Sequence, residues 1–245
     1  MAASLQLELC VVVVVFAAIQ SVFGVGLLVF GTPTLLLLGL PFEQVLAYLL
    51  PCSIVISALQ VQSGGGLTLE PIRRRLLLWT VPGVLAGTVL VLTMGTSLHV
   101  KSIVGAMLVL TAAARALGPA REAVGGFVRR QLTPALAVLG VLHGLSNLGG
   151  GVLAFIVGSV FTEKRDIRKH VAFGYGLMAV VQVITLFATT SVRLRPALWL
   201  TLPALAGLTF AAVGQRLFAA AGQRTYQWGL TLLLLLFGVA LVATA

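Results

Sequence analysis

The chain has 245 residues, of which 59% are hydrophobic and only 9% are charged. A soluble globular domain carries about 25% charged residues, so this composition excludes a soluble enzyme, a nucleic-acid-binding domain and a disordered chain. The net charge of +10 fits basic loops between membrane-crossing segments. At about 20 residues per crossing, the chain has room for roughly eight to ten crossings.

Ten apolar segments follow one another along the chain, separated by short polar or glycine-containing stretches. In lipid every backbone polar group must find its partner inside the protein, so these segments are predicted to be helices. The fold class is therefore all-α integral membrane, with multiple crossings. The segments lie at 5–22, 25–40, 45–62, 76–93, 99–117, 132–147, 150–161, 171–188, 196–214 and 226–244.

The order of residues repeats itself at a spacing of about 120 residues. The stretch Phe23-Gly24-Val25-Gly26 aligns with His143-Gly144-Leu145-Ser146. Duplication of this kind is common in transporters and predicts two homologous halves, 1–117 and 131–245, joined by a basic cytoplasmic linker at 118–130. The clearest matches pair Arg73, Arg75, Trp79, Pro82 and Gly87 with Arg193, Arg195, Trp199, Pro203 and Gly207.

Loop charges indicate how the two halves are oriented. Parallel halves place 9 of the 16 lysines and arginines on the cytoplasmic side, whereas inverted halves that each open with a re-entrant hairpin place 13 there. We therefore expect inverted repeats, about eight transmembrane helices and periplasmic termini. Only 31 residues separate Arg130 from Thr162, where two crossings need about 40. Two half-length helices meeting at the glycine run 149–151 fit this length, with a single kinked helix in each half as the alternative.

The predicted substrate site is built from these two helix breaks. Glycine and proline interrupt a helix at membrane depth, and the amides exposed at a helix N-terminus bind anions without a full positive charge. The alternative is that the small residues only allow close helix packing. The candidate binding residues are Gly24, Gly26, Gly31 and Thr32 in the first half, His143, Ser146, Asn147, Gly149, Gly150 and Gly151 in the second, and Ser53, Gln60 and Gln182 in the segments that follow the breaks.

Side-chain chemistry assigns roles to some of these residues. Asn147 offers two donors and an acceptor, and His143 lies one helical turn before it, where it could donate to an anion or relay a proton. Gln60 and Gln182 are expected to face a hydrated path, because a primary amide is costly in lipid. The alternatives are a simple interhelical hydrogen bond for Asn147 and an ordinary packed histidine for His143. No Asp or Glu lies inside a segment except Glu8 near one edge, so we predict neither a metal nor a cofactor.

The pattern resembles the TauE/SafE family of bacterial membrane permeases, the sulfite exporters. The resemblance rests on the Gly-rich break from Phe23 to Pro33, the Leu-rich stretch to Pro41, the Ala-x-x-x-x-x-Ser stretch at 47–53, and their repeat from Gly144 to Ala172. It covers nearly the whole chain. It implies a permease of the bacterial inner membrane that transports small sulfur-containing anions such as sulfite or organosulfonates.

We therefore expect a secondary transporter, not an enzyme, that exports a small anion through a midplane site. The expected partners are this anion and membrane lipid, without nucleic acid, and a homo-oligomer is left open. The alternatives are a permease for another anion, a cation or metal exporter, an integral membrane enzyme, and a non-catalytic partner subunit. An enzyme would need convergent acids and histidines, and the three histidines are scattered.

Overall fold

The computed structural model describes residues 2–66, 71–94, 118–192 and 195–243, with short stretches between 105 and 116. Every regular element in these ranges is helical. This confirms the prediction of an all-α membrane protein. Most of the predicted segment at 99–117 lies outside the described residues. Five described helices are long and apolar enough to cross a membrane: Leu5–Phe23, Phe42–Ser63, Pro71–Met94, Lys164–Thr189 and Pro196–Ala220.

The first three helices form a hairpin followed by a long helix. Helix α1 (Ala2–Phe23) ends at Gly24, and α2 (Leu27–Leu37) folds back along it, so that the rings of Phe16 and Phe30 lie 6.1 Å apart. Helix α3 (Phe42–Ser63) then returns beside α2. The break predicted from Gly24 and Gly26 separates α1, which has 22 residues, from α2, which has 11.

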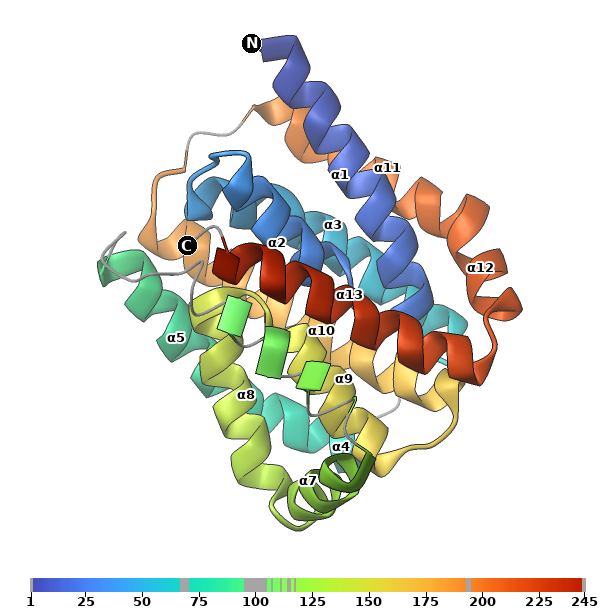
Figure 1. Ribbon diagram of the computed structural model, residues 1–245. Helices are drawn as coiled ribbons and strands as arrows, with labels where there is room; N and C mark the ends of the chain where they lie inside the picture. Colours follow the sequence, from blue (N-terminus) through green and yellow to red (C-terminus); the bar gives the residue numbers. More distant parts are fainter. Residues whose placement is uncertain are drawn as a thin grey trace.

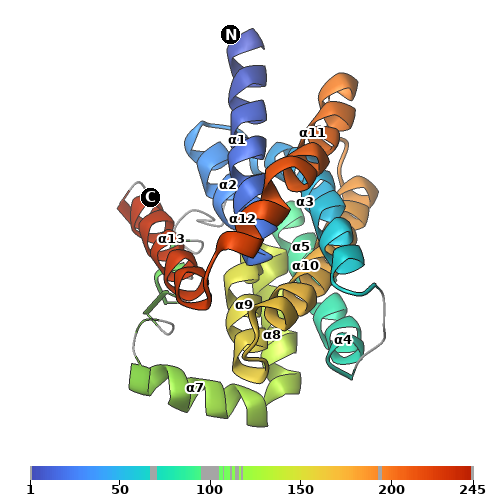
Figure 2. The same ribbon diagram turned by 90° about the vertical axis from the view of Figure 1, so that its right-hand side faces the viewer.

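The described residues in the middle of the chain include a helix with a π-helical turn and an amphipathic helix. Helices α4 (Pro71–Arg75) and α5 (Val81–Met94) continue through a π-helical turn, Leu76–Thr80. The predicted linker at 118–130 forms helix α7 (Gly118–Arg130), which packs on α9 and α8. In Figure 2 α7 lies at the foot of the bundle, opposite the N-terminus of the chain.

The second part of the chain again opens with a hairpin and a long helix. Helices α8 (Leu132–Ser146) and α9 (Gly149–Val160) meet at a two-residue break, and α10 (Lys164–Thr189) follows. Figure 1 shows the remaining elements on the outside of the bundle. They are α11 (Pro196–Thr209), a π-helical turn (Phe210–Gly214), α12 (Gln215–Ala220) and α13 (Gln223–Ala243).

Glycine contacts hold α5 against α8 with their backbones touching. Gly83 and Gly87 on α5 face Gly140 and Gly144 on α8, and a Cβ atom at Gly83 would lie 2.8 Å from the Val141 nitrogen. Both pairs have the GxxxG spacing that lets transmembrane helices approach closely. Gly144, part of the motif that we matched to the first break, therefore serves helix packing.

Candidate functional site

The first helix break is built by two glycines. Gly24 has a φ of +79°, a left-handed conformation, and its amide donates to the carbonyl oxygen of Gln20 at 2.8 Å. A Cβ atom at Gly26 would lie 2.5 Å from the backbone nitrogen of Gln20. Glycine is thus required at both positions, once for conformation and once for space. The close approach lets α2 start beside the end of α1.

The second break repeats this geometry with an asparagine. Asn147 has a φ of 62°, and its amide donates to the carbonyl oxygen of His143 at 2.7 Å. Asparagine tolerates the left-handed region better than most residues. Gly24 and Asn147 therefore play the same backbone role, and so do Gln20 and His143. This pairing lies three residues away from the sequence alignment that set Gly24 against Gly144.

A buried glutamine donates hydrogen bonds to the last backbone carbonyls of the helix before each break. Gln60 on α3 donates from Nε2 to the carbonyl oxygens of Gln20 (2.8 Å) and Ser21 (3.2 Å). Gln182 on α10 donates from Nε2 to the carbonyl oxygen of His143 at 3.3 Å. The Oε1 atoms of both glutamines are buried and have no hydrogen-bond partner. The two glutamines that the sequence singled out thus occupy equivalent places.

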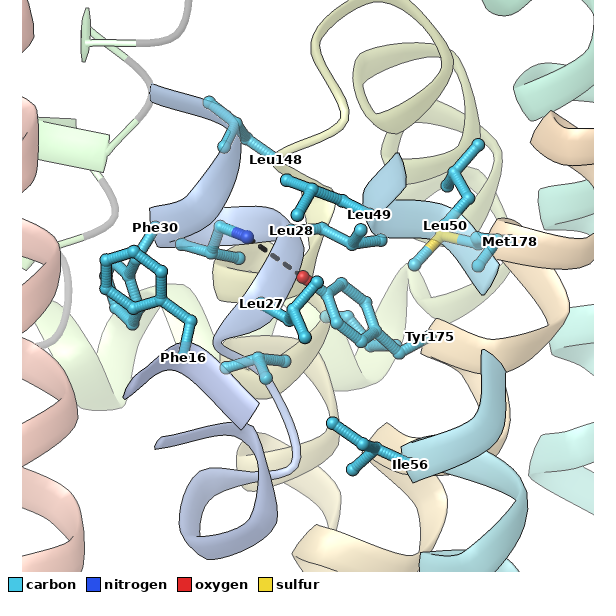
Figure 3. Close-up of a cluster of buried hydrophobic side chains, with 14 of the residues drawn as sticks. Phe16, Leu27, Leu28, Phe30, Leu49, Leu50, Ile56, Leu148, Tyr175 and Met178 are labelled. Atoms are coloured by element: carbon cyan, nitrogen blue, oxygen red, sulfur yellow. Dashed lines mark hydrogen bonds between the residues drawn. The ribbon is translucent and has the colours of Figure 1, made fainter. Parts of the chain in front are cut away.

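The amides that start α2 are already occupied by side chains. Gln20 accepts the Leu27 amide on its Oε1 at 3.2 Å, and its Nε2 donates to the hydroxyls of Ser53 (3.2 Å) and Ser57 (3.3 Å). Tyr175 on α10 accepts the Val29 amide at 3.0 Å, the bond drawn in Figure 3. The N-terminus of α2 is therefore satisfied by the protein itself.

The start of α9 is different. Its three glycines are buried, and its N-cap residue, Leu148, makes no side-chain capping bond. A Cβ atom at Gly149 would lie 2.9 Å from Nδ1 of His143. Both ring nitrogens of His143 are buried without a partner. A buried polar group without a partner is costly, so the imidazole beside the start of α9 has hydrogen-bonding capacity for a further group.

The two breaks touch each other in the middle of the bundle. Asn147 donates from Nδ2 to Oγ1 of Thr32 on α2 at 2.8 Å, while its own Oδ1 is buried and unpartnered. A Cβ atom at Gly150 would lie 2.6 Å from Cε2 of Tyr175 and 2.8 Å from Cγ2 of Val29. The first turns of α2 and α9 are therefore neighbours, with Tyr175 packed between them.

The remaining predicted residues lie around this junction. Ser146 donates to the carbonyl oxygen of Leu142 and accepts the Leu148 amide at 3.3 Å. Gly31 faces the side chain of Leu49, where a Cβ atom would come within 3.0 Å. All the predicted site residues are buried.

Sequence reasoning missed Gln20 as a site residue and did not place Tyr175 in the site. Gln20 organises the first break through its carboxamide, and Tyr175 binds across to the other half of the chain. The signal for Gln20 was available, because a primary amide inside an apolar segment is as costly there as at Gln60. The partner of Tyr175 is 146 residues away and leaves no local pattern.

The junction combines an absence of buried acids, among the described residues, with two helix N-termini. No aspartate or glutamate is buried in the described part of the chain, and no group of three potential metal ligands occurs among those residues. The positive ends of two helix dipoles, at α2 and α9, meet there instead. Such ends bind anionic groups.

Comparison with known proteins gives one match. No curated protein and no solved structure matches the chain. The family model described as sulfite exporter TauE/SafE matches residues 9–241. Because this match spans nearly the whole length, the chain belongs to the TauE/SafE sulfite exporter family of membrane transport proteins.

Proposed function

We propose that the chain is a secondary transporter that exports a small sulfur-containing anion, such as sulfite or an organosulfonate, across the bacterial inner membrane. The family consists of transporters, and the apolar helices agree with a multi-pass membrane protein. The observation that carries the midplane site is the buried, glycine-rich start of α9, whose N-cap residue Leu148 makes no side-chain capping bond, beside the buried ring of His143.

In this proposal the anion binds at the second break. The amides of the glycine run 149–151 would donate to its oxygens, and a neutral imidazole at His143 would add one N–H. Asn147 would contribute its Nδ2, which now donates to Thr32. The first break supports this site from the other side. Gln20 and Tyr175 accept hydrogen bonds from the first amides of α2 and so hold the start of that helix in place.

We also propose that the chain is an inverted repeat, with halves at 1–117 and 131–245 joined by 118–130. Each half contains a hairpin, a left-handed break residue and a glutamine bound to the carbonyl four residues before that break residue. Helix α3 packs antiparallel to α10, since Gly64 lies beside Lys169 and Gly176 beside Ser57. Alternating movement of two such units around a fixed site is how transporters of this architecture work.

The test is sulfite flux from proteoliposomes that contain the purified protein. Gly150→Leu should abolish flux, because the position has no room beside Tyr175. Gly158→Leu is the matched control on the same helix, since a Cβ atom there meets nothing within 4 Å, and it should transport normally. Asn147→Ser, which keeps a short hydrogen-bonding side chain, should reduce flux only in part. Normal flux from Gly150→Leu protein of correct monodispersity would refute the midplane site.

A further inference from the structure

A separate pocket of about 510 Å³ opens where α3 ends and α10 begins. Gln60 lines this pocket, and its Nε2 donates to the carbonyl oxygen of Gln20 at the end of α1. The pocket wall carries one acidic residue, Asp166, against four basic ones. These lining residues include Lys164, Arg165, Asp166, Arg168, Lys169 and Phe218.

Arg168 is the notable group in this wall. Its side chain is only 8% exposed, and its Nη1 donates to the carbonyl oxygen of Ser21 at 3.2 Å. Its guanidinium carbon lies 3.5 Å from the centre of the Phe218 ring. No carboxylate pairs with it in the described part of the chain. A guanidinium has five N–H donors, and the bond to Ser21 uses one.

A buried charge without a counter-charge is unfavourable. The neighbouring Lys164 is committed elsewhere, because its Nζ donates to the carbonyl oxygens of Phe218 (3.0 Å) and Ala221 (2.5 Å). Asp166 shares the pocket without forming an ion pair to Arg168. The cavity therefore offers a desolvated, planar cation with unused donors, which suits the oxygens of an oxyanion.

We propose that this pocket is a second anion site, distinct from the second break, in which Arg168 binds a small free oxyanion. The inference depends on the proposed function only for the choice of sulfite as the probe. The bonds of Gln60 to Gln20 and Ser21, and of Arg168 to Ser21, separate the pocket from the first break. An anion in the pocket would use the Arg168 donors that the bond to Ser21 leaves open.

The experiment is equilibrium binding of sulfite to the purified full chain in an uncharged detergent. Gly150→Leu, which fills the midplane position, should still bind sulfite at one saturable site. Arg168→Gln in that background should weaken this binding about 10- to 150-fold, the range for a hydrogen bond to a charged group. Arg168→Lys keeps the charge without the planar fork and should fall between the two. Arg130→Gln, an exposed arginine on α7 outside the pocket, should change nothing.

Two variants that leave the Arg168 contacts intact protect the test against misfolding. Asp166→Asn removes the one acid of the wall and should tighten binding about 2- to 5-fold, while Arg165→Gln should weaken it by a similar factor. A misfolded protein does not gain affinity, so tighter binding by Asp166→Asn supports the site on its own. Unchanged binding in the Arg168, Arg165 and Asp166 variants would overturn the proposal.

A lipid headgroup carries similar chemistry, and a parallel titration with phosphatidylglycerol separates the two sources. Binding of this lipid that depends on Arg168, without any sulfite binding that depends on Arg168, would overturn the free-anion assignment. Binding of sulfite that depends on Arg168 in a protein that transports no sulfite would keep this site and refute the proposed transport. Sulfite transport by a protein whose sulfite binding does not depend on Arg168 would support the proposed transport and refute this site.

Discussion

Replacement of Asn147 separates its backbone role from its side-chain role. Its φ of 62° puts it in the left-handed region, and its Nδ2 donates to Thr32 at 2.8 Å. Asn147→Ala and Asn147→Gly both remove the amide, which costs about 0.5–1.5 kcal/mol for one buried hydrogen bond. Alanine loses about a further 1–2 kcal/mol of stability because it must adopt the left-handed conformation. Glycine loses about 0.5–1 kcal/mol because its unfolded chain has more conformational entropy.

The net difference is about 1 kcal/mol in favour of Asn147→Gly. For a chain of this size, that corresponds to a melting temperature about 2–4 °C higher than that of Asn147→Ala. The assay is thermal unfolding in detergent, with sulfite flux measured on the same preparations. Both variants lack the donor and should lose flux to the same extent. An alanine variant that melts at or above the glycine variant would refute the backbone argument, and wild-type flux from Asn147→Gly would remove this side chain from the site.

Three further outcomes are expected. Gly24→Ala should destabilise the protein more than Gly39→Ala, because both have positive φ but only Gly24 has a neighbour, with Val171 Cγ1 3.1 Å from the Cβ position; equal melting temperatures would contradict this. Gln20→Leu should cost about 1–3 kcal/mol by stripping the Leu27 amide of its acceptor, while the exposed Gln62→Leu should cost under about 0.5 kcal/mol, as measured by thermal unfolding. A C-terminal alkaline phosphatase fusion should be active and a C-terminal green fluorescent fusion dark if the termini are periplasmic; the opposite pair of results would sink the inverted arrangement.

Composition and local sequence pattern were enough to predict the helices and the first break. The apolar segments give the helices, and Gly24 and Gly26 give the first break, because only glycine fits a left-handed turn and a close backbone approach. Gln60 and Gln182 could be singled out because a primary amide is costly in lipid. Both were expected to face a hydrated path; in the structure each donates to the last turn of the helix before a break.

The partners of the site residues were not predictable, because they depend on contacts across the chain. The bond from Asn147 to Thr32 spans 115 residues, and the bond from Val29 to Tyr175 spans 146. The sequence match set Gly24 against Gly144, because such a match aligns glycine with glycine. The structure pairs Gly24 with Asn147 instead, because both adopt the left-handed conformation. The GxxxG pairs of α5 and α8 explain why Gly144 looked like part of the break.

We propose that the second break binds the transported anion. A density map of the chain in lipid nanodiscs with saturating sulfite, compared with a map without it, tests this most directly. Sulfite density is expected within hydrogen-bond distance of the amide nitrogens of 149–151, beside His143, in addition to any density at Arg168. Density confined to the Arg168 pocket, or an unchanged second break in a preparation that transports sulfite, would contradict the account.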